Sequence, residues 1–129
     1  MAKRKSVNFP GFSHQNPIPN SSRIGNLLMS SVISGVDPGT RNLPPTLEGQ
    51  VSNIFKHIRA CVEAGGGTVD DIIKVTFWMK QPSTGRTALN GEWEKMFPDP
   101  ASRPARHTQV LSADSPGQVT CDVIAVIGS

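Results

Sequence analysis

The fold is decided by the stretch TLEGQVSNIFKHIRACVEAGGGTVDDIIKVTFWMK, residues 46–80, which joins a helical pattern to a strand pattern through three glycines. In residues 46–64 apolar side chains recur at steps of three and four, which predicts an amphipathic helix with one buried stripe. The stripe consists of Leu47, Val51, Ile54, Phe55, Ile58, Cys61 and Val62. The polar face is expected to carry Glu48, Gln50, Lys56, Arg59 and Glu63. Thr46 can cap the first turn, and a glycine of residues 65–67 can end the helix in the left-handed conformation.

Residues 72–80 alternate along the chain, which predicts a strand with one apolar face. That face is expected to hold Ile73, Val75, Phe77 and Met79. The opposite face is expected to hold Lys74, Thr76 and Trp78.

Outward from this unit, three more strands and a second helix are predicted. The strands occupy residues 27–33, 106–111 and 118–127, and the helix occupies residues 88–97. Residues 82–85 are interpreted as a turn before that helix. Residues 1–22, rich in Pro, Asn, Ser and Gly, are expected to form an arm and loop in front of a single domain at residues 23–129. This order indicates an α+β fold with two helices on one face of a sheet.

The last predicted strand supplies a further inference, because its side chains alternate between two faces. The side chains expected to face the helices are Val119, Cys121, Val123, Ala125 and Ile127. Those expected to face away are Thr120, Asp122, Ile124 and Val126. Together with Thr76 and Trp78, this second face is too apolar to remain in water. We therefore expect it to pack against another copy of the chain.

Composition narrows the classes of function. The 129 residues are 36% hydrophobic and 18% charged, which is typical of a soluble globular protein. The formal net charge of +3 matches the three cations at residues 3–5, so the remaining domain is nearly neutral and nucleic acid is not an expected partner. Neither a membrane-spanning run nor an export signal is visible, so no membrane partner is expected.

Cysteine and histidine give no sign of a metal site. Cys61 and Cys121 fall at apolar positions, which favours two buried thiols in a reducing, cytoplasmic compartment over a disulfide. The chain contains no CxxC or HExxH motif, and His14, His57 and His107 are not spaced as ligands on one element. We expect no metal.

Two charged residues on late strands form the candidate site. Arg106 begins a predicted strand after a proline turn, where its guanidinium can bind a small anion. Asp122 interrupts an apolar strand, and a carboxylate in such a place needs a partner or a function. Two structural alternatives stay open: a surface or interface ion pair for Arg106, and a pairing of Asp122 with Arg106 itself.

Several motifs taken together resemble the RidA/YjgF family. They are Gly25-Asn26-Leu27, Asp37-Pro38, Glu63-Ala64-Gly65-Gly66, Asp70-Asp71-Ile72-Ile73-Lys74-Val75-Thr76, Asn90, Phe97, Pro104-Ala105-Arg106 and a final strand with an acid. The similarity runs in order over roughly residues 20–127, which makes it more specific than a single short motif. The resemblance implies a chorismate-mutase-like α+β subunit with a mixed sheet, assembled as a homotrimer with clefts between subunits.

The resemblance also implies a cofactor-independent deaminase, which hydrolyses carboxylate-bearing enamines or imines to a keto acid and ammonia. The family arginine that grips the substrate carboxylate matches Arg106, and the late-strand glutamate matches Asp122. Arg106 and Asp122 are thus the candidate catalytic residues. The candidate substrate-binding residues are Ser31, Ile18, Asn90, His107 and His14.

Three departures from the family pattern surround the candidate site. Ile18 stands where the family has a tyrosine, Pro19 where it has a serine, and Val32 where it has a glycine. Asp122 is also one methylene shorter than the family glutamate. These changes leave the carboxylate-binding arginine in place and put 2-aminoacrylate in doubt as the substrate.

Residues 14–17 and 91–97 are similar to the 2-aminomuconate deaminase branch of the family, which points to a longer dicarboxylate substrate. His14, Arg23 or His107 would then make the second contact. A module that binds a small carboxylate without turnover is the main alternative. A ribonuclease or translation inhibitor is a third, against which the nearly neutral charge of the domain argues.

Overall fold

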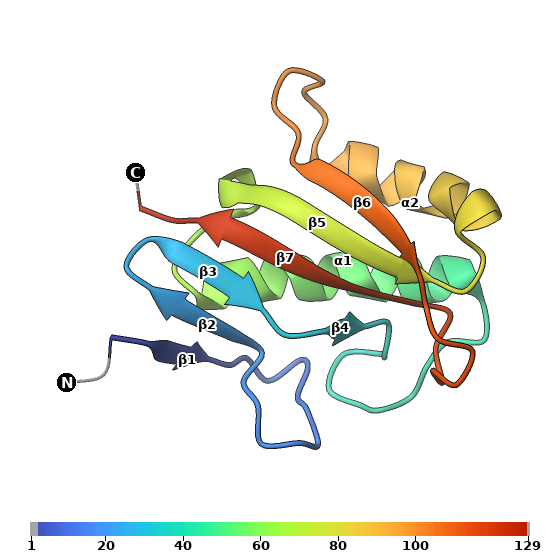
Figure 1. The fold of residues 1–129 in the computed structure, drawn as a ribbon, viewed down its shortest axis with the longest axis horizontal. Helices are drawn as coiled ribbons and strands as arrows, with labels where there is room; N and C mark the ends of the chain where they lie inside the picture. Colours follow the sequence, from blue (N-terminus) through green and yellow to red (C-terminus); the bar gives the residue numbers. More distant parts are fainter. Residues whose placement is uncertain (1–2, 129) are drawn as a thin grey trace.

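In the computed structural model, which describes residues 3–128, a mixed sheet carries two helices on one side (Figure 1). The strands among these residues are β1 (Lys5–Val7), β2 (Ser21–Ile24), β3 (Leu27–Ser30), β4 (Ile33–Ser34), β5 (Ile72–Met79), β6 (Ala105–Val110) and β7 (Val119–Val126). The α-helices are α1 (Leu47–Ala64) and α2 (Pro82–Met96), and a short 3-10 turn at Val69–Asp71 precedes β5. The predicted α+β class is confirmed.

The strand order is β1-β2-β3-β7-β5-β6, with β4 also paired to β7. The pair β5–β6 is parallel, and the other pairs are antiparallel. Parallel neighbours need a crossover, and α2 supplies it between β5 and β6. Strand β6 therefore lies at an edge of the sheet, beside α2 (Figure 1).

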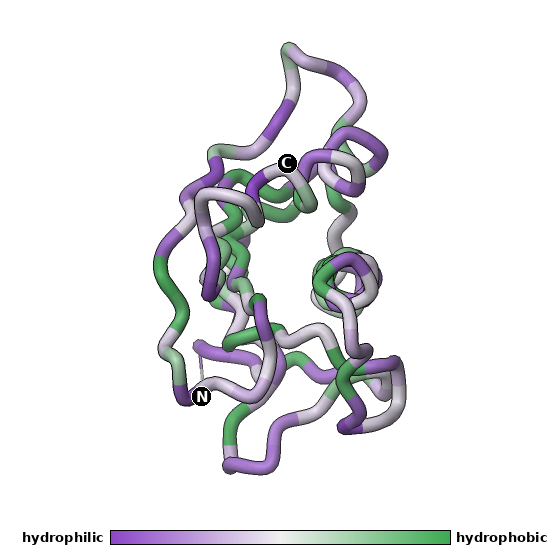
Figure 2. Tube along the Cα trace, turned by 90° about the vertical axis from the view of Figure 1, so that its right-hand side faces the viewer, coloured by the Kyte–Doolittle hydropathy of each residue, from purple (hydrophilic) through white to green (hydrophobic). Residues whose placement is uncertain are grey.

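Helix α1 begins and ends as the sequence predicts. Oγ1 of Thr46 accepts a hydrogen bond from the amide of Gly49 at 3.1 Å, and Gly66 adopts a φ of +96° just beyond the helix. The predicted apolar stripe lies in the core and faces the strands, with Leu47 partly buried at its start (Figure 2).

One position on this helix differs from the prediction. Gln50 is buried instead of lying on the polar face. Its Nε2 donates to the carbonyl of Pro44 at 2.9 Å, and its Oε1 accepts from the amide of Gln118 at 2.8 Å. The side-chain amide can be buried because both of its polar atoms have hydrogen-bond partners, and these bonds connect α1 to the start of β7.

The parity predicted for the last strand is confirmed. Val119, Cys121, Val123 and Ala125 are at most 1% exposed and face the helices. The opposite side of the sheet, which we call the open face, is not covered by a helix of the described residues (Figure 2). It presents Thr76 and Trp78 of β5, Asp122, Ile124 and Val126 of β7, Leu27 and Met29 of β3, and Ile24 of β2.

The predicted face of β5 is wrong at Ile73, which is 51% exposed. The β5–β7 register shifts between Ile72 and Lys74, so Ile72 enters the core in its place. A bulge of this kind adds one residue and inverts the alternation on one side of it. From Val75 onward the predicted parity holds.

The second helix begins at Pro82, so the turn predicted at residues 82–85 is wrong. A proline is compatible with the first helical turn, where its missing amide hydrogen has no partner to lose. Gly85 lies inside the helix because a Cβ there would be 2.5 Å from Cε of Met79, so the glycine lets α2 approach β5 closely.

Within the expected arm and loop at residues 1–22, residues 8–20 form a loop as predicted, whereas residues 5–7 and 21–22 belong to the sheet, and residues 1–2 lie outside the described residues. Strand β1 pairs with β2, and β2 pairs with β3. Side-chain amides hold the loop between β1 and β2, since Asn20 donates to the carbonyl of Phe12 at 2.9 Å and accepts from the amide of Phe9 at 3.3 Å. These strands are polar, so the apolar alternation that predicts a strand is missing.

The strand predicted at residues 27–33 is interrupted at residues 31–32. Oγ of Ser30 accepts a hydrogen bond from the amide of Val123 at 2.9 Å, and the amide of Ser31 turns away to Asn20. Pairing with β7 then resumes in β4.

Neither helix in the described residues is long and apolar enough to cross a bilayer.

Candidate functional site

Arg106 lies on the edge strand β6 and points toward α2. Its register partner is Val75, which pairs with Val123, so the side chain projects on the helix-covered side of the sheet. Nη2 of Arg106 donates to Oδ1 of Asn90 at 3.0 Å, and the guanidinium carbon lies 5.1 Å from the centre of the Trp93 ring. An amide and an aromatic ring thus fix the guanidinium plane.

The second nitrogen of this guanidinium has no partner. Nη1 of Arg106 is buried and makes no hydrogen bond within the described residues. Burial lowers the pKa of the Arg106 guanidinium, and the charge of Arg86 lowers it further. Arginine still keeps its proton under these conditions, so the site holds a positive charge with an unsatisfied donor. An anion, and a carboxylate in particular, can balance the positive charge and accept the hydrogen bond from Nη1.

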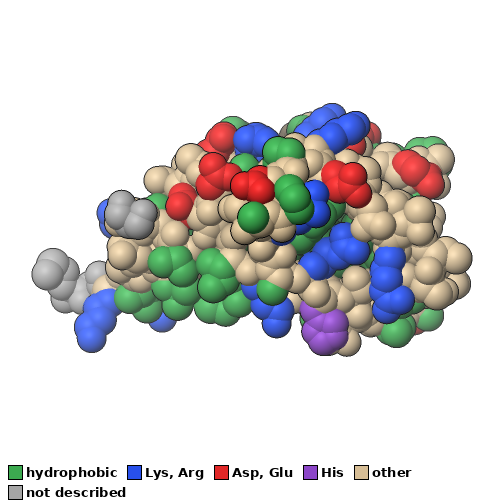
Figure 3. Space-filling model, turned by 90° about the horizontal axis from the view of Figure 1, so that it is seen from above, with side chains coloured by type: hydrophobic (Ala, Val, Ile, Leu, Met, Phe, Trp, Pro, Cys, Tyr) green, Lys and Arg blue, Asp and Glu red, His purple; other side chains and the backbone are tan. Residues whose placement is uncertain are grey.

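Figure 3 shows the edge of the sheet beside α2 and β6, where Lys and Arg side chains gather around a hollow. No ion pair within 4.0 Å joins Arg106 to an acid in the part of the chain that the structure describes. The surface or interface ion pair considered for Arg106 is therefore absent within the described subunit.

Asp122 lies on the other side of the sheet. It pairs in register with Thr76, which in turn pairs with His107, so these three side chains share the open face. Oδ2 of Asp122 accepts a hydrogen bond from Nε1 of Trp78 at 3.2 Å. The alternative that Asp122 pairs with Arg106 of its own subunit is wrong, because Arg106 is in register with Val75 on the helix-covered side, whereas Asp122 lies on the open face.

The remaining sequence candidates are spread over the subunit. Asn90 contacts Arg106, as described above. Oγ of Ser31 donates to the carbonyl of Pro19 at 2.8 Å, so its hydroxyl holds the loop that contains Ile18. Ile18 is 45% exposed. His107 is exposed beside Gln109 on the open face.

His14 lines a pocket of about 390 Å³ together with Val32 and Thr120. Its Nε2 is buried and has no hydrogen-bond partner among residues 3–128, and burial, followed by the charge of Arg41, lowers the pKa of the imidazole. Thr120 lies two residues before Asp122 on the same face of β7, so this pocket borders the open face.

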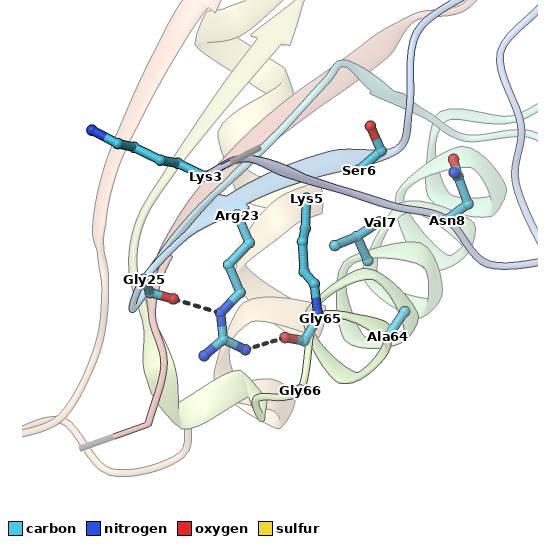
Figure 4. A pocket seen from close by; sticks show the side chains of 10 residues that line it. All are labelled: Lys3, Lys5, Ser6, Val7, Asn8, Arg23, Gly25, Ala64, Gly65 and Gly66. Carbon is cyan, nitrogen blue, oxygen red and sulfur yellow. Dashed lines mark hydrogen bonds between the residues drawn. The ribbon is translucent and has the colours of Figure 1, made fainter. Parts of the chain in front are cut away.

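Arg23, the other suggested second contact, lies in a different pocket, of about 760 Å³ (Figure 4). Its Nε donates to the carbonyl of Gly25 at 2.7 Å, and its Nη1 donates to the carbonyl of Gly65 at 2.5 Å. The guanidinium thereby satisfies the carbonyl of Gly65 at the end of α1, where a positive charge is favourable, and a carbonyl of the turn between β2 and β3. Arg23 has a structural role and is separate from the Arg106 site.

Trp93 lies in the core of the subunit and is only 8% exposed. Its second role under Arg106 was missed, as was the Trp78 contact to Asp122. Helical spacing could have found the first, because Asn90 and Trp93 are three residues apart on one face of α2. No group of three or more His, Cys, Asp or Glu side chains in the described range is arranged to hold a metal ion.

Comparison with known proteins adds to this geometry. The family model for endoribonuclease L-PSP matches residues 15–127 of the chain. The protein belongs to this family, the RidA/YjgF family. The predicted family resemblance is thereby confirmed.

RidA/YjgF relatives bear different names. The 2-iminobutanoate/2-iminopropanoate deaminase of Escherichia coli is 31% identical over 104 residues, which cover 80% of each chain. A RutC family protein of Haemophilus influenzae is 30% identical over 81 residues, so that the match spans 63% of this chain and only 62% of that relative. The solved structure of RidA from an Antarctic Psychrobacter has a TM-score of 0.85 at 25% identity and covers 95% of this chain and 99% of that one.

Proposed function

We propose that the protein hydrolyses a carboxylate-bearing imine, or the enamine that tautomerises to it, to a keto acid and ammonia. The observation that carries this proposal is the unpartnered, buried Nη1 of Arg106, held in place by Asn90 and Trp93. A fixed guanidinium with a free donor suits a carboxylate. The E. coli relative whose name includes imine deamination supports the reaction class.

The chemistry needs few groups. Arg106 binds the carboxylate and so fixes the neighbouring imine carbon, which is already electrophilic. Water adds to that carbon, the C–N bond breaks, and the nitrogen leaves as ammonia while C=O forms. A carboxylate near the water can orient it or take its proton, and Asp122 is the candidate. No cofactor takes part in this proposed route.

The two candidate residues lie on opposite faces of one sheet, so a site that contains both is completed by a second copy of the chain. The open face supports such an assembly, because Ile24, Leu27, Met29 and Val126 are 45–52% exposed there. We propose a homotrimer in which Arg106 of one subunit meets the open-face side of its neighbour, near Asp122 and the loop of Ile18 and Ser31.

The identity of the substrate within this class is also a proposal. Ile18 and Val32 are exposed apolar side chains, and His14 offers a buried nitrogen without a partner. These features suit a substrate with more than a methyl group beyond the imine carbon, such as a 2-aminomuconate-like acid. A 2-aminoacrylate-like acid is the smaller alternative substrate.

The proposal is tested by generating 2-iminobutanoate from 2-aminobutanoate with an amino-acid oxidase and timing its loss. The protein should accelerate the loss, and Arg106→Ala should lower kcat/KM about 100-fold or more, because two charge-assisted hydrogen bonds disappear. Arg59→Ala is the control, since Arg59 is exposed on α1 and pairs with Glu63. Loss at the spontaneous rate with wild-type protein, or full activity of Arg106→Ala, would overturn the proposal.

A module that binds small carboxylates without turnover is the second candidate. It is favoured by the absence of a carboxylate next to Arg106 within the described part of its own subunit. Such a module would be stabilised by 2-oxobutanoate through Arg106, since a ligand of the folded state raises the unfolding temperature. Stabilisation without imine loss would select this function.

A further inference from the structure

Arg86 lies one helical turn before Asn90 on α2, and its side chain makes no ion pair within the described residues. We propose that Arg86 and Arg106 together bind a substrate with two anionic groups, so that the site prefers an imine derived from a dicarboxylic amino acid. This inference rests on the proposed function and adds a specificity-determining residue to it.

The placement of Arg86 follows from the spacing along α2. Asn90 and Trp93 both contact the Arg106 guanidinium, which identifies the face of α2 that turns toward β6. Arg86 is four residues before Asn90, so it lies on that same face about one turn, roughly 5 Å, toward the start of the helix. Arg86 is exposed, whereas Nη1 of Arg106 is buried.

The two guanidiniums are not neutralised by the protein. The positions three and four residues from Arg86 on α2 are Pro82, Ser83, Leu89 and Asn90, none of which is acidic. Neither arginine has an acid within 4.0 Å anywhere in residues 3–128. Arg86 also lies close enough to Arg106 for its charge to disfavour protonation there. Two like charges kept together without an acid are stabilised when a dianion binds between them.

Another arginine near this site is already occupied. Nε of Arg103 donates to the carbonyl of Phe97 at 2.8 Å, which holds the loop after α2. Arg86 has no such contact in the hydrogen bonds of the described side chains. The difference in burial between Arg106 and Arg86 then indicates which carboxylate each arginine binds. The buried Nη1 of Arg106 receives the carboxylate next to the imine carbon, and the exposed Arg86 receives the distal carboxylate.

The reaction on such a substrate balances as for the smaller one. The iminium carbon gains the oxygen of one water, the C–N bond breaks, and nitrogen leaves as ammonium while both carboxylates stay unchanged. Binding of the distal carboxylate adds affinity without entering the bond changes. Its loss should therefore appear mainly in KM.

The test compares two imines made in place by amino-acid oxidases, 2-iminoglutarate from glutamate and 2-iminobutanoate from 2-aminobutanoate. Wild-type protein should prefer 2-iminoglutarate. Arg86→Ala should lower kcat/KM for that imine about 10- to 100-fold, the range of one hydrogen bond to a charged group, with the four-carbon imine changed less than about twofold. Lys95→Ala is the matched control, because it removes a cation from the far side of the same helix.

A binding measurement separates this inference from the proposed function. In calorimetric titrations, 2-oxoglutarate should bind wild-type protein more tightly than 2-oxobutanoate, and Arg86→Ala should abolish the difference. If no imine is hydrolysed but this binding difference is found, the proposed function fails and the dianion site stands. If 2-iminobutanoate is hydrolysed without preference for the longer imine, or Arg86→Ala affects both imines equally, the inference is overturned and the proposed function stands.

Discussion

The two faces of the sheet differ in how much of a site each completes by itself. On the helix-covered side, Arg106 is positioned by Asn90 and Trp93 of the same subunit. On the open face, Asp122 has one partner, Trp78, and lies on a surface with exposed apolar side chains. The first region is complete within one subunit, and in the proposed homotrimer the second is completed by another copy of the chain. Folding and assembly therefore contribute different halves of the proposed site.

The largest expected effect comes from a charge on the open face. Met29→Glu should prevent assembly, because Met29 is 50% exposed in the subunit and would carry an unpaired carboxylate into the interface. Activity should fall more than about 100-fold while far-ultraviolet circular dichroism stays unchanged. Sedimentation would report the mass, and Arg59→Glu on α1 is the control. An assembled, active Met29→Glu protein would remove the proposed role of the open face.

Asp122→Asn tests whether the carboxylate on the open face takes part in the chemical step. The amide can still accept the hydrogen bond from Trp78, but it cannot take a proton from water. We expect kcat to fall about 100-fold, with KM nearly unchanged because Arg106 still binds the carboxylate. Steady-state kinetics on 2-iminobutanoate would show this split. A rise in KM with unchanged kcat would assign Asp122 to binding alone.

Asn90→Ala tests how far the helix side positions its own arginine. Removing the acceptor at 3.0 Å frees the Arg106 guanidinium, and kcat/KM should fall about tenfold. Asn90 is exposed, so the unfolding temperature should barely change. Equal loss of stability and activity would instead make Asn90 a structural residue.

The smallest effect concerns the buried His57 on α1. Nε2 of His57 lies 2.8 Å from the carbonyl of Val36, and burial lowers the pKa of this imidazole below its ordinary value of 6.5. The unfolded chain then binds the proton more readily, so the stability of the fold is full above about pH 6.5 and declines as the pH falls below it. Urea denaturation at several pH values should show this decline. In His57→Gln the decline should be smaller, and an unchanged pH profile would contradict the assignment.

The sequence was a good guide where alternation or helical spacing is regular. It predicted α1, β6, β7 and the two faces of the last strand, because burial there follows the period of the backbone. It failed at Ile73, where a bulge shifts the register, and at β1 and β2, where side-chain amides and backbone pairing replace apolar contacts. Both failures depend on contacts between distant residues, which a local pattern does not contain.

In the candidate site, too, some features could be predicted from local sequence and others depend on contacts between distant residues. The chemistry of their side chains makes Arg106 and Asp122 candidates, and the structure places both at partly buried positions. Their placement on opposite faces follows from the pairing of β6 and β7 with β5, which the sequence of either strand alone does not give. Arg86 was missed because it lies before the residue where the second helix was predicted to begin.

In the proposed homotrimer, one subunit supplies Arg106 to each site and another supplies Asp122. Mixed assemblies of Arg106→Ala and Asp122→Asn subunits, refolded together in equal amounts, test this arrangement directly. Each variant alone should be nearly inactive, while the mixture should regain about a quarter of wild-type imine hydrolysis, because one interface in four combines the intact halves of both. A mixture no more active than its separate components would show that Arg106 and Asp122 of one site do not come from different subunits.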